Sequence, residues 1–414
     1  MISFKISKRC RLCNHKKLFK ILDLPPTIPG EQLKKNKFEI NTNLIPIDFY
    51  LCSKCKHVQL THVPNFKDLW GKDYTFKPSD NPVLIKHFTK TINYFIKNHK
   101  KNIFKAFEVG SNDGIFLKIL KEKTNCKILG IDPSDEPVNL AKKNKIPTIK
   151  KYFDFKVSKD IKKQHGKFDL VIANNVFAHM HDMQSITKGI SNLLEVNGYF
   201  IFEASYLIDV MNKFLIGTII HEHISIHSVT ALYPFLKKFE LNLIDLIHVK
   251  DIQGGALIGI AKKSRFNKKT EKLEKFLQFE KRFGLNKING FVNYQNKFNK
   301  KINQFSKKIN KYIDSGTLVG YGAARSAPLI IDIFNLKNKI KYIIDDNPRK
   351  VGKYIHTNNI PIKPYKSVKK EINKKIIFIF GWAQTKRILD FLEKKNKNLI
   401  VITIFPKFEI IKIN

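Results

Sequence analysis

The stretch FEVGSNDGIFLKIL, residues 107–120, gives the clearest indication of the fold class. A short apolar run ends at Val109, Gly110 and Gly114 flank a polar turn, and apolar residues then recur at helical spacing. Glycines let the backbone approach a bound ligand closely, and the first N–H groups of a helix are free to point at it. This order of strand, Gly-rich turn and helix predicts the first βα unit of a Rossmann-like sheet.

The charges of this turn favour a cationic ligand over a phosphate. The turn lacks the G-x-G-x-x-G pattern expected for a pyrophosphate, and Glu108 and Asp113 would repel one. The same carboxylates suit the positively charged S-adenosylmethionine. Asp132 ends the next strand, KILGID, where a carboxylate can accept hydrogen bonds from both hydroxyls of a ribose. These features predict a class I methyltransferase rather than a generic Rossmann domain.

A third signal, ANNVFAHMHD, follows another apolar strand of the same segment. The carboxyl ends of parallel strands meet at one edge of a sheet, so the two asparagines there are expected at the ligand, although they could be simple turn residues. The residues expected at the cofactor are Glu108, Gly110, Ser111, Asn112, Asp113, Gly114, Asp132, Asn174 and Asn175.

The surrounding sequence divides into four parts. Strand-like runs alternate with helical spacing over residues 76–263, which predicts a doubly wound parallel α/β sheet. Residues 264–313 are lysine-rich, with an apolar stripe typical of a packed helical connector. From 314 to 414 the strand, Gly-rich turn and helix pattern returns in TLVGYGAARSAPLIIDIF, which predicts a second Rossmann-like domain. Residues 1–75 carry four cysteines. The apolar stripe of the connector, residues 264–313, consists of Phe291, Tyr294, Phe298, Ile302, Phe305, Ile309 and Tyr312.

The cysteines form two C-x-x-C pairs, CRLC and CSKC, in the N-terminal part. Two such knuckles match a structural zinc site with four thiolates, Cys10, Cys13, Cys52 and Cys55. A redox pair or two disulfides is the alternative, which a reducing cytosol disfavours. Because cysteine side chains fill all four coordination positions of the metal, this zinc is expected to be structural and not catalytic.

The composition excludes several classes of protein. The net charge is +41, yet only seven of the 76 basic residues are arginine and the lysines run the whole length. Nucleic-acid readers concentrate their charge and mix arginine with aromatic residues, so no dedicated nucleic-acid site is expected. No apolar run reaches the length of a membrane span, and MISFKISKRC has no apolar signal core, so a cytoplasmic protein is expected.

The stretch IIHEHISIH, residues 219–227, holds three histidines and one glutamate. A zinc-protease helix needs H-E-x-x-H, and Ser225 stands where its second histidine would be. Strand-like alternation predicts that His221 and His223 share one face and that Glu222 points to the other. A metal site, a catalytic base and a merely polar strand all remain open at this point.

The motifs in series resemble the sugar C-methyltransferase family. They are the paired C-x-x-C knuckles, EVGSNDG, GIDP, ANNVFAHM, FEASY, IIHEHIS, QGGAL, GYGAARSAP and DDNPRKVGKY, and they run from end to end of the chain. The resemblance implies a zinc-binding N-terminal domain, a methyltransferase domain and a Rossmann-like C-terminal domain. It implies transfer of a methyl group from S-adenosylmethionine to a carbon of a nucleotide-linked keto-deoxysugar.

The resemblance also implies roles for individual side chains. The family carries its general base at the second histidine of H-E-H, here His223, with the glutamate, here Glu222, assisting at the substrate. His179 and Tyr74 match family positions near the reacting sugar. A neutral histidine suits the removal of a proton beside a ketone, which carbon methylation requires. The remaining histidines of the stretch, His221 and His227, are expected to be structural.

The sequence departs from the family at several substrate-side positions. Ile220 replaces a tyrosine, Ala256 and Ile258 replace a serine and an arginine, and Ser326 replaces a lysine. These departures imply a different sugar or a different acceptor atom. In the C-terminal part, the loop 320–328 and the pair Asp345–Asp346 are expected to contact the sugar nucleotide, unless they merely mimic a cofactor site.

Two rival functions stay open at the level of sequence. One is a methyltransferase of the same fold acting on oxygen or nitrogen of a sugar nucleotide or related metabolite, where a base is less essential. The other is a zinc-containing nucleic-acid-binding protein that keeps a Rossmann scaffold. The identity of the sugar and the nucleotide does not follow from the sequence, which also does not fix the oligomeric state; a monomer is one possibility.

Overall fold

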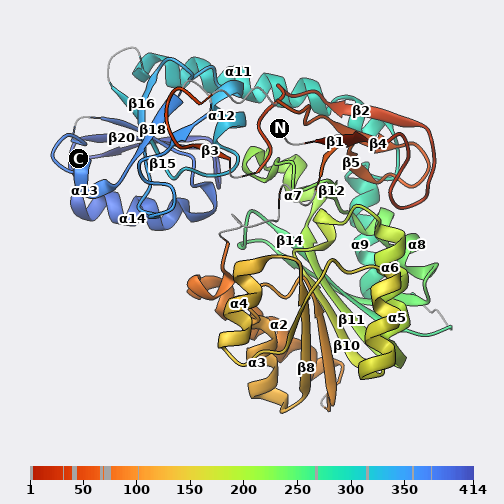
Figure 1. Ribbon diagram of the computed structural model, residues 1–414. Coiled ribbons are helices and arrows are strands. Elements are labelled where there is room, and N and C mark those ends of the chain that lie inside the picture. The colour runs from red at the N-terminus through yellow and green to blue at the C-terminus, as the bar shows by residue number, and fades with distance from the viewer. Residues whose placement is uncertain are drawn as a thin grey trace.

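The computed structural model describes residues 3–30, 32–39, 44–65, 69, 76–100, 102–265, 269–313, 317–356, 359–373 and 375–414. The described residues form two large sheets, a four-stranded sheet and a two-stranded sheet (Figure 1). The middle part, residues 76–263, forms the lower half of Figure 1, and the N-terminal and C-terminal parts lie side by side above it. The predicted α/β class, with a small cysteine-bearing part and two Rossmann-like sheets, is confirmed.

The middle sheet has seven strands in the order β13-β14-β11-β10-β7-β8-β9. Its strands β7 to β11 are parallel, and β14 runs antiparallel to both β11 and β13. The strand order reverses between β7 and β10, and ligands of open α/β sheets bind at such a switch point. The strands are β7 (Lys105–Val109), β8 (Lys127–Asp132), β9 (Thr148–Lys150), β10 (Phe168–Asn174), β11 (Leu194–Ser205), β13 (Leu241–Val249) and β14 (Ala256–Lys263).

Helices cover both faces of this sheet because every central strand is apolar on both sides. One face packs against α2 (Pro82–Asn98), α3 (Ile115–Thr124) and α4 (Asp135–Lys143), and the other against α5 (Phe155–His165) and α6 (Met183–Leu193). Figure 1 shows the two groups on opposite sides of β8, β10 and β11. The helices α7 (Leu207–Asn212) and α8 (Val229–Lys237) follow β11.

The N-terminal sheet includes a strand from the middle of the chain. Its order is β12-β5-β4-β2, in which β12 (Ser225–Ile226) pairs antiparallel with β5 (Val58–Leu60). The remaining strands are β2 (Leu18–Leu22) and β4 (Phe49–Cys52), and β1 (Phe4–Ile6) pairs separately with β6 (His62–Pro64). The segment that carries IIHEHIS is therefore built into the cysteine-bearing part of the protein.

The C-terminal sheet has eight strands in the order β21-β20-β19-β15-β16-β18-β17-β3, and β3 (Leu33–Lys34) comes from the N-terminal part. The order of its parallel strands reverses between β15 and β19, which gives this sheet its own switch point. The strands are β15 (Leu318–Tyr321), β16 (Ile340–Ile344), β17 (Tyr354–Ile355), β18 (Ile360–Lys363), β19 (Ile376–Ile379), β20 (Leu399–Thr403) and β21 (Glu409–Ile413), and the helices are α12 (Ala327–Ile333), α13 (Tyr365–Val368) and α14 (Thr385–Lys395).

The connector is helical, as its apolar spacing predicts. It consists of α9 (Glu271–Arg282), α10 (Asn289–Val292) and α11 (Tyr294–Ile313), and α11 runs along the top of Figure 1 over both upper sheets. The predicted stripe is buried along α10 and α11, except for the partly exposed Tyr312 at its end. Among the described residues, no helix combines the length and the apolarity that a membrane span requires.

Candidate active site

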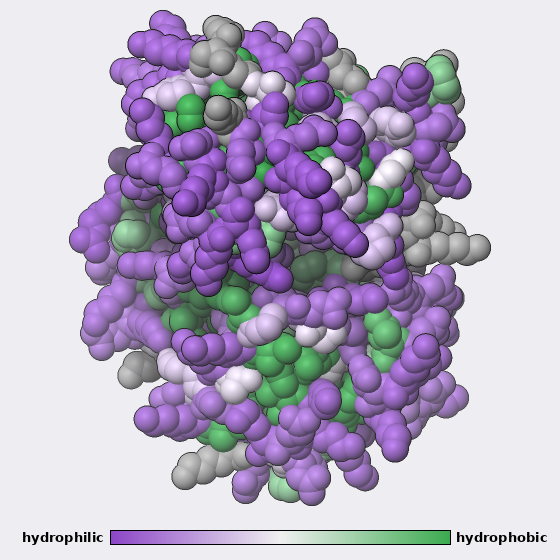
Figure 2. Space-filling view, turned by 90° about the vertical axis from the view of Figure 1, so that its left-hand side faces the viewer, coloured by the Kyte–Doolittle hydropathy of each residue, from purple (hydrophilic) through white to green (hydrophobic). Residues whose placement is uncertain are grey.

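A cavity of about 650 Å³ lies between the edge of the middle sheet and the C-terminal part. Loops from the switch points of both large sheets line it, with Gly110 and Asn175 on one side and Arg325 and Trp382 on the other. Figure 2 shows apolar residues gathered in a hollow between the two halves of the molecule. The cavity has the size of a small-molecule site, so both Rossmann-like sheets face one ligand-binding space.

The turn after β7 needs glycine at its first position. Gly110 has φ +67°, and a Cβ atom there would lie 2.5 Å from Cγ2 of Val176. The backbone N–H groups of Asn112 and Ser134 donate to the two carboxylate oxygens of Asp132, at 3.0 and 2.9 Å. These bonds hold the ends of β7 and β8 together at the cavity wall.

Glu108 is buried and incompletely paired. Its Oε1 accepts a hydrogen bond from Asn174 Nδ2 at 3.3 Å, whereas Oε2 has no partner within the described part of the chain. Burial raises the pKa of Glu108 well above its ordinary value; the hydrogen bond from Asn174 opposes this, and the nearby carboxylates of Asp113 and Asp132 add to it. A buried carboxyl with an unpaired oxygen, at the wall of a largely apolar cavity, fits a ligand that carries positive charge.

The predicted cofactor residues do not all reach this space. Glu108, Gly110, Ser111, Asn112, Asp132, Asn174 and Asn175 line the cavity. Asp113 instead accepts backbone hydrogen bonds from Ser79 and Ile115, and it lines a smaller pocket beside Gly114. Gly114 directly precedes α3 and packs against Ile146. The structure therefore gives Asp113 and Gly114 a role in shaping the turn.

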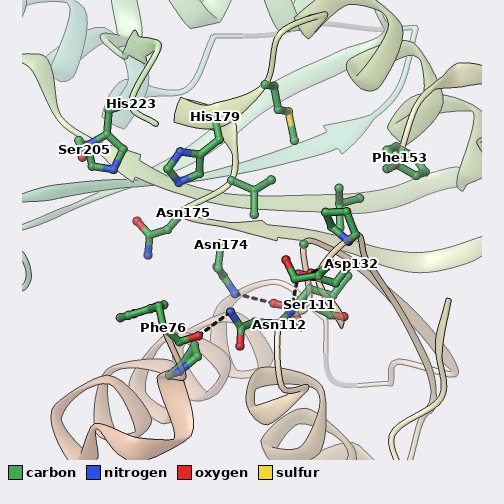
Figure 3. Close-up of a pocket in the computed structure, with 18 of the residues that line it drawn as sticks. Phe76, Ser111, Asn112, Asp132, Phe153, Asn174, Asn175, His179, Ser205 and His223 are labelled. Carbon is green, nitrogen blue, oxygen red and sulfur yellow. Dashed lines mark hydrogen bonds between the residues drawn. The ribbon is translucent and has the colours of Figure 1, made fainter. Parts of the chain in front are cut away.

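Sequence reasoning missed the segment after β9. Tyr152, Phe153 and Asp154 line the same cavity, because β9 ends at the same edge of the sheet as β7 and β8. In Figure 3, Phe153 lies across the cavity from Asn175. The signal was present as KYFDF directly after a strand, but the strand has only three residues and shows no clear periodicity.

His223 lines the opposite wall of the cavity in a defined tautomer. Its Nδ1–H donates to the carbonyl oxygen of Thr218 at 2.6 Å, so Nε2 carries the lone pair. Burial lowers the pKa of His223 to about 4; the bond to Thr218 opposes this and the charge of Arg325 adds to it. The imidazole is therefore neutral at neutral pH, which is the form that accepts a proton.

His179 stands beside His223, with a distance of 5.0 Å between the ring centroids. Its Nδ1–H donates to the carbonyl oxygen of Glu222 at 2.7 Å, and burial lowers its pKa to about 3. Figure 3 shows the two imidazoles on one side of the cavity and Asp132, Ser111 and Asn112 on the other. Tyr74, the remaining residue expected near the reacting sugar, lies outside the described residues.

The predicted strand-like alternation of IIHEHIS is wrong. The N–H of His223 donates to the carbonyl oxygen of Ile220 at 3.0 Å, which closes a turn, and the strand β12 begins only at Ser225. His221 consequently points away from His223, and its Nε2 bonds to the carbonyl oxygen of Ile45 at 3.0 Å in the N-terminal part. His227 bonds to the carbonyl oxygen of Phe177, and neither His221 nor His227 lines the cavity.

Glu222 acts on the cavity through another residue. It is buried behind the wall, and its Oε1 lies 3.6 Å from Nε of Arg325, which does line the cavity. Arg325 sits in the loop after β15, between Ala324 and Ser326, which line the cavity as well. The ion pair joins the H-E-H turn to the C-terminal sheet.

The C-terminal part also contributes Trp382, which the sequence reasoning did not single out. A Cβ atom on Gly217 would lie 2.1 Å from the indole Nε1 of Trp382, so the ring packs directly on this glycine. The two expected acids do not reach the cavity. Asp345 binds the backbone N–H groups of Ala323 and Asn347, and Asp346 binds that of Tyr365.

The four cysteines form a metal site apart from the cavity. The sulfur atoms of Cys10 and Cys55 are 3.4 Å apart, those of Cys13 and Cys52 are 3.5 Å apart, and all four lie within 4.8 Å of one another. Zn–S bonds of about 2.3 Å in a tetrahedron place sulfur atoms about 3.8 Å apart, so four thiolates at these distances fit zinc. All four cysteines are free of disulfides.

Three family models match successive parts of the chain. A zinc binding domain matches residues 10–70, a methyltransferase domain matches residues 107–200, and the C-terminal domain of C-methyltransferases matches residues 251–404. Their order is the order of the three sheets. Together they identify the chain as an S-adenosylmethionine-dependent methyltransferase with an N-terminal zinc-binding domain.

Methyltransferases of several kinds are similar to this chain. The C-methyltransferase NovU from Streptomyces niveus is 25% identical over 358 residues, which cover 85% of this chain and 84% of NovU. The ubiquinone biosynthesis O-methyltransferase from Pelagibacter ubique is 29% identical over 147 residues, 32% of this chain and 57% of that protein. The crystal structure of the N-methyltransferase NodS from Bradyrhizobium japonicum WM9 with S-adenosyl-L-homocysteine covers 47% of this chain and 94% of NodS, at 13% identity and a TM-score of 0.36.

Proposed function

We propose that this chain, whose successive parts match the zinc binding, methyltransferase and C-methyltransferase C-terminal family models, methylates a carbon of a nucleotide-linked keto-deoxysugar, with His223 as the general base. One observation carries the proposal: a single cavity has Asp132 on one wall and the neutral imidazole of His223 on the opposite wall, and Glu108, hydrogen-bonded to Asn174, lines the same cavity. Residues of the C-terminal sheet close the same space. This arrangement supports a donor and an acceptor bound face to face.

The donor side of the cavity follows the polar groups of the middle sheet. S-adenosylmethionine, when bound, supplies an electrophilic methyl group on a sulfonium centre and leaves as S-adenosylhomocysteine. The unpaired Oε2 of Glu108 is suited to the positive end of this molecule, and Asp132 to its ribose hydroxyls. Asn174 and Asn175 flank this wall, and Phe153 provides an apolar surface for the adenine.

The acceptor side supplies the base. Nε2 of His223 would take a proton from the carbon beside the sugar ketone, which leaves an enolate whose carbon forms the new bond to the methyl group. The carbonyl oxygen of Thr218 already accepts the Nδ1–H bond and so stabilises the imidazolium that results. His179, with its Nδ1–H bound to the Glu222 carbonyl, stands close enough to contact the same sugar. We retain Tyr74 as a further candidate there.

The C-terminal sheet is suited to the nucleotide half of the acceptor. Arg325 places a guanidinium in the cavity wall, which is the residue type that binds phosphates best. Glu222 would assist by holding this guanidinium through their ion pair. Trp382 adds an aromatic face to the same wall, against which an apolar face of a deoxysugar can pack. Ile220 also lines the wall and adds no hydrogen-bonding side chain there.

The test is incubation of the protein with isotopically labelled S-adenosylmethionine and a panel of keto-sugar nucleotides, followed by NMR of the product. The proposal expects a new C–CH₃ group on the sugar. An O–CH₃ or N–CH₃ group would establish the rival methyltransferase activity instead. Steeply salt-dependent binding of RNA or DNA, with no methyl transfer to any sugar nucleotide, would favour a nucleic-acid-binding protein.

A further inference from the structure

The turn that carries His223 is held by the zinc-bearing part of the chain. Directly after this turn, the carbonyl oxygen of Ile224 accepts the backbone N–H of Leu60 at 3.0 Å, and β12 then pairs with β5. Nε2 of His57 lies 3.1 Å from the hydroxyl of Ser225 in the same register. The position of His223 is therefore set by a sheet whose strand β4 ends at the metal ligand Cys52.

One side chain connects the metal site to this turn directly. Arg11 lies between the zinc ligands Cys10 and Cys13, and its Nη1 donates to the carbonyl oxygen of Ile224 at 3.0 Å. Its backbone N–H donates to Oε1 of Gln59 at 2.9 Å, which fixes the knuckle against β5. The second lone pair of the Ile224 carbonyl is thus used by a residue of the zinc knuckle.

The burial of Arg11 calls for an explanation. The residue is only 8% exposed, and within the described ranges it forms no ion pair with a carboxylate, while its Nη2 has no hydrogen-bond partner. A buried guanidinium is costly unless an opposite charge lies nearby. Zn²⁺ with four thiolates carries a net charge of about −2, and Arg11 sits between two of those ligands in sequence. Cys10 is a neighbouring group whose negative charge acts on Arg11, so a zinc-bound thiolate cluster would supply the charge that keeps this arginine buried.

We propose that Arg11 is a positioning residue, which uses the charge of the zinc site to hold the Ile224 carbonyl and thereby fix the His223 turn. This inference rests on the proposed function in that it takes His223 as the base. The inference gives the zinc site a part in positioning the active-site residues, in addition to its part in the folding of the N-terminal sheet.

The test replaces Arg11 by methionine, which keeps length and apolar bulk but removes both the charge and the donor. Arg9→Met is the matched control, because Arg9 belongs to the same knuckle but binds the carbonyl oxygen of Asn14 at 3.3 Å in an exposed position. In protein labelled with ¹⁵N-histidine, the His223 signals are assigned from their loss in His223→Gln. Zinc content and S-adenosylhomocysteine affinity are measured for each variant.

We expect Arg11→Met to shift the His223 ¹⁵N signals and to lower kcat by roughly 10–100-fold, since a small misplacement of a reacting group has effects of this size. Zinc content and S-adenosylhomocysteine affinity should stay within about twofold, Arg9→Met should change nothing, and Arg11→Lys should recover part of kcat. Unchanged His223 signals and unchanged kcat in a folded, zinc-loaded Arg11→Met protein overturn the inference.

A second measurement covers the case in which Arg11→Met does not fold. Zinc is withdrawn from the unmodified full chain with a chelator while the His223 signals and the S-adenosylhomocysteine affinity are followed. The inference expects the His223 signals to shift while the affinity for S-adenosylhomocysteine persists. His223 signals that stay unchanged after zinc is removed overturn it. Failure of the proposed function is recognised by a different result. In that case His223→Gln would keep full turnover, whatever effect Arg11→Met has on the His223 signals.

Discussion

Nε of Arg325 lies 3.6 Å from Oε1 of Glu222, and this ion pair joins the C-terminal sheet to the turn that carries His223. Both residues are largely shielded from water, so the pair is screened weakly and ties the acceptor side of the cavity together. Gly30 of the N-terminal part also approaches Glu222, since a Cβ atom there would lie 4.0 Å from Oε1. All three parts of the chain therefore meet at this carboxylate.

Arg325→Met should raise KM for the acceptor by about 100-fold or more, because it removes a charged hydrogen-bond donor from the cavity and leaves a buried carboxylate without its guanidinium. The affinity for S-adenosylhomocysteine should change less than about threefold. Arg387→Met is the control, since Arg387 is exposed on α14 of the same sheet. Steady-state kinetics with the acceptor varied checks the prediction, and an equal loss of donor affinity would contradict it.

Gly110→Ala should weaken S-adenosylhomocysteine binding by at least about tenfold. The new Cβ atom would clash with Val176, which itself lines the cavity, and φ +67° is unfavourable for alanine. Gly352 is a matched control, because it has φ +81° but nothing within 4 Å of the position that a Cβ atom would take. Calorimetric titration should show normal affinity for Gly352→Ala, and normal affinity for Gly110→Ala would argue against this wall as the donor site.

The affinity for S-adenosylhomocysteine should fall as the pH is lowered from neutral. Burial raises the pKa of Glu108 in the free protein, so Glu108 takes up a proton at a higher pH than an ordinary glutamate does. A protonated Glu108 must lose this proton before it can bind the cationic amine of the ligand. Binding near this pKa should release protons, which calorimetry in buffers of different ionisation enthalpy detects. Glu108→Gln should bind more weakly at neutral pH and lose most of the pH dependence; an unchanged profile would remove Glu108 from the site.

The folded state should lose stability between about pH 6.5 and pH 4. Burial lowers the pKa of several histidines to about 3 or 4, so the unfolded chain, in which they titrate near 6.5, binds more protons in this window and stability rises with pH. Thermal unfolding at pH 5 should occur at least about 5 °C below that at pH 7. These histidines are His179, His181, His221, His223 and His227.

A single substitution locates this effect. His227→Gln removes one buried titrating group and should flatten the dependence of the unfolding temperature on pH. His165→Gln should leave the dependence as it is, because His165 is exposed at the end of α5. A pH dependence that neither substitution alters would place its source in other groups.

The sequence was sufficient for those features whose signal is local. FEVGSNDG and KILGIDPSD each combine an apolar strand with a polar turn, and both strands lie in the parallel sheet as expected. The paired C-x-x-C knuckles likewise bring four sulfur atoms together. Each strand with its turn, and each knuckle, is contained within about ten consecutive positions, so spacing alone carries the information.

Features that depend on distant pairing could not be read in this way. The strands β3 and β12 have two residues each, too few to show periodicity, and each joins a sheet belonging to another part of the chain. IIHEHIS alternates like a strand, yet His221 finds its partner at Ile45 and the segment turns. Trp382 reaches the cavity only because the C-terminal sheet has its switch point there.

The role of His223 as the base is tested most sharply by the turnover of His223→Asn, measured with a keto-sugar nucleotide that the unmodified protein methylates. Asparagine keeps a donor for the Thr218 carbonyl but has no basic nitrogen. We expect kcat to fall by about 10²–10⁴-fold while S-adenosylhomocysteine binds with nearly unchanged affinity. Turnover close to that of the unmodified protein would contradict this role.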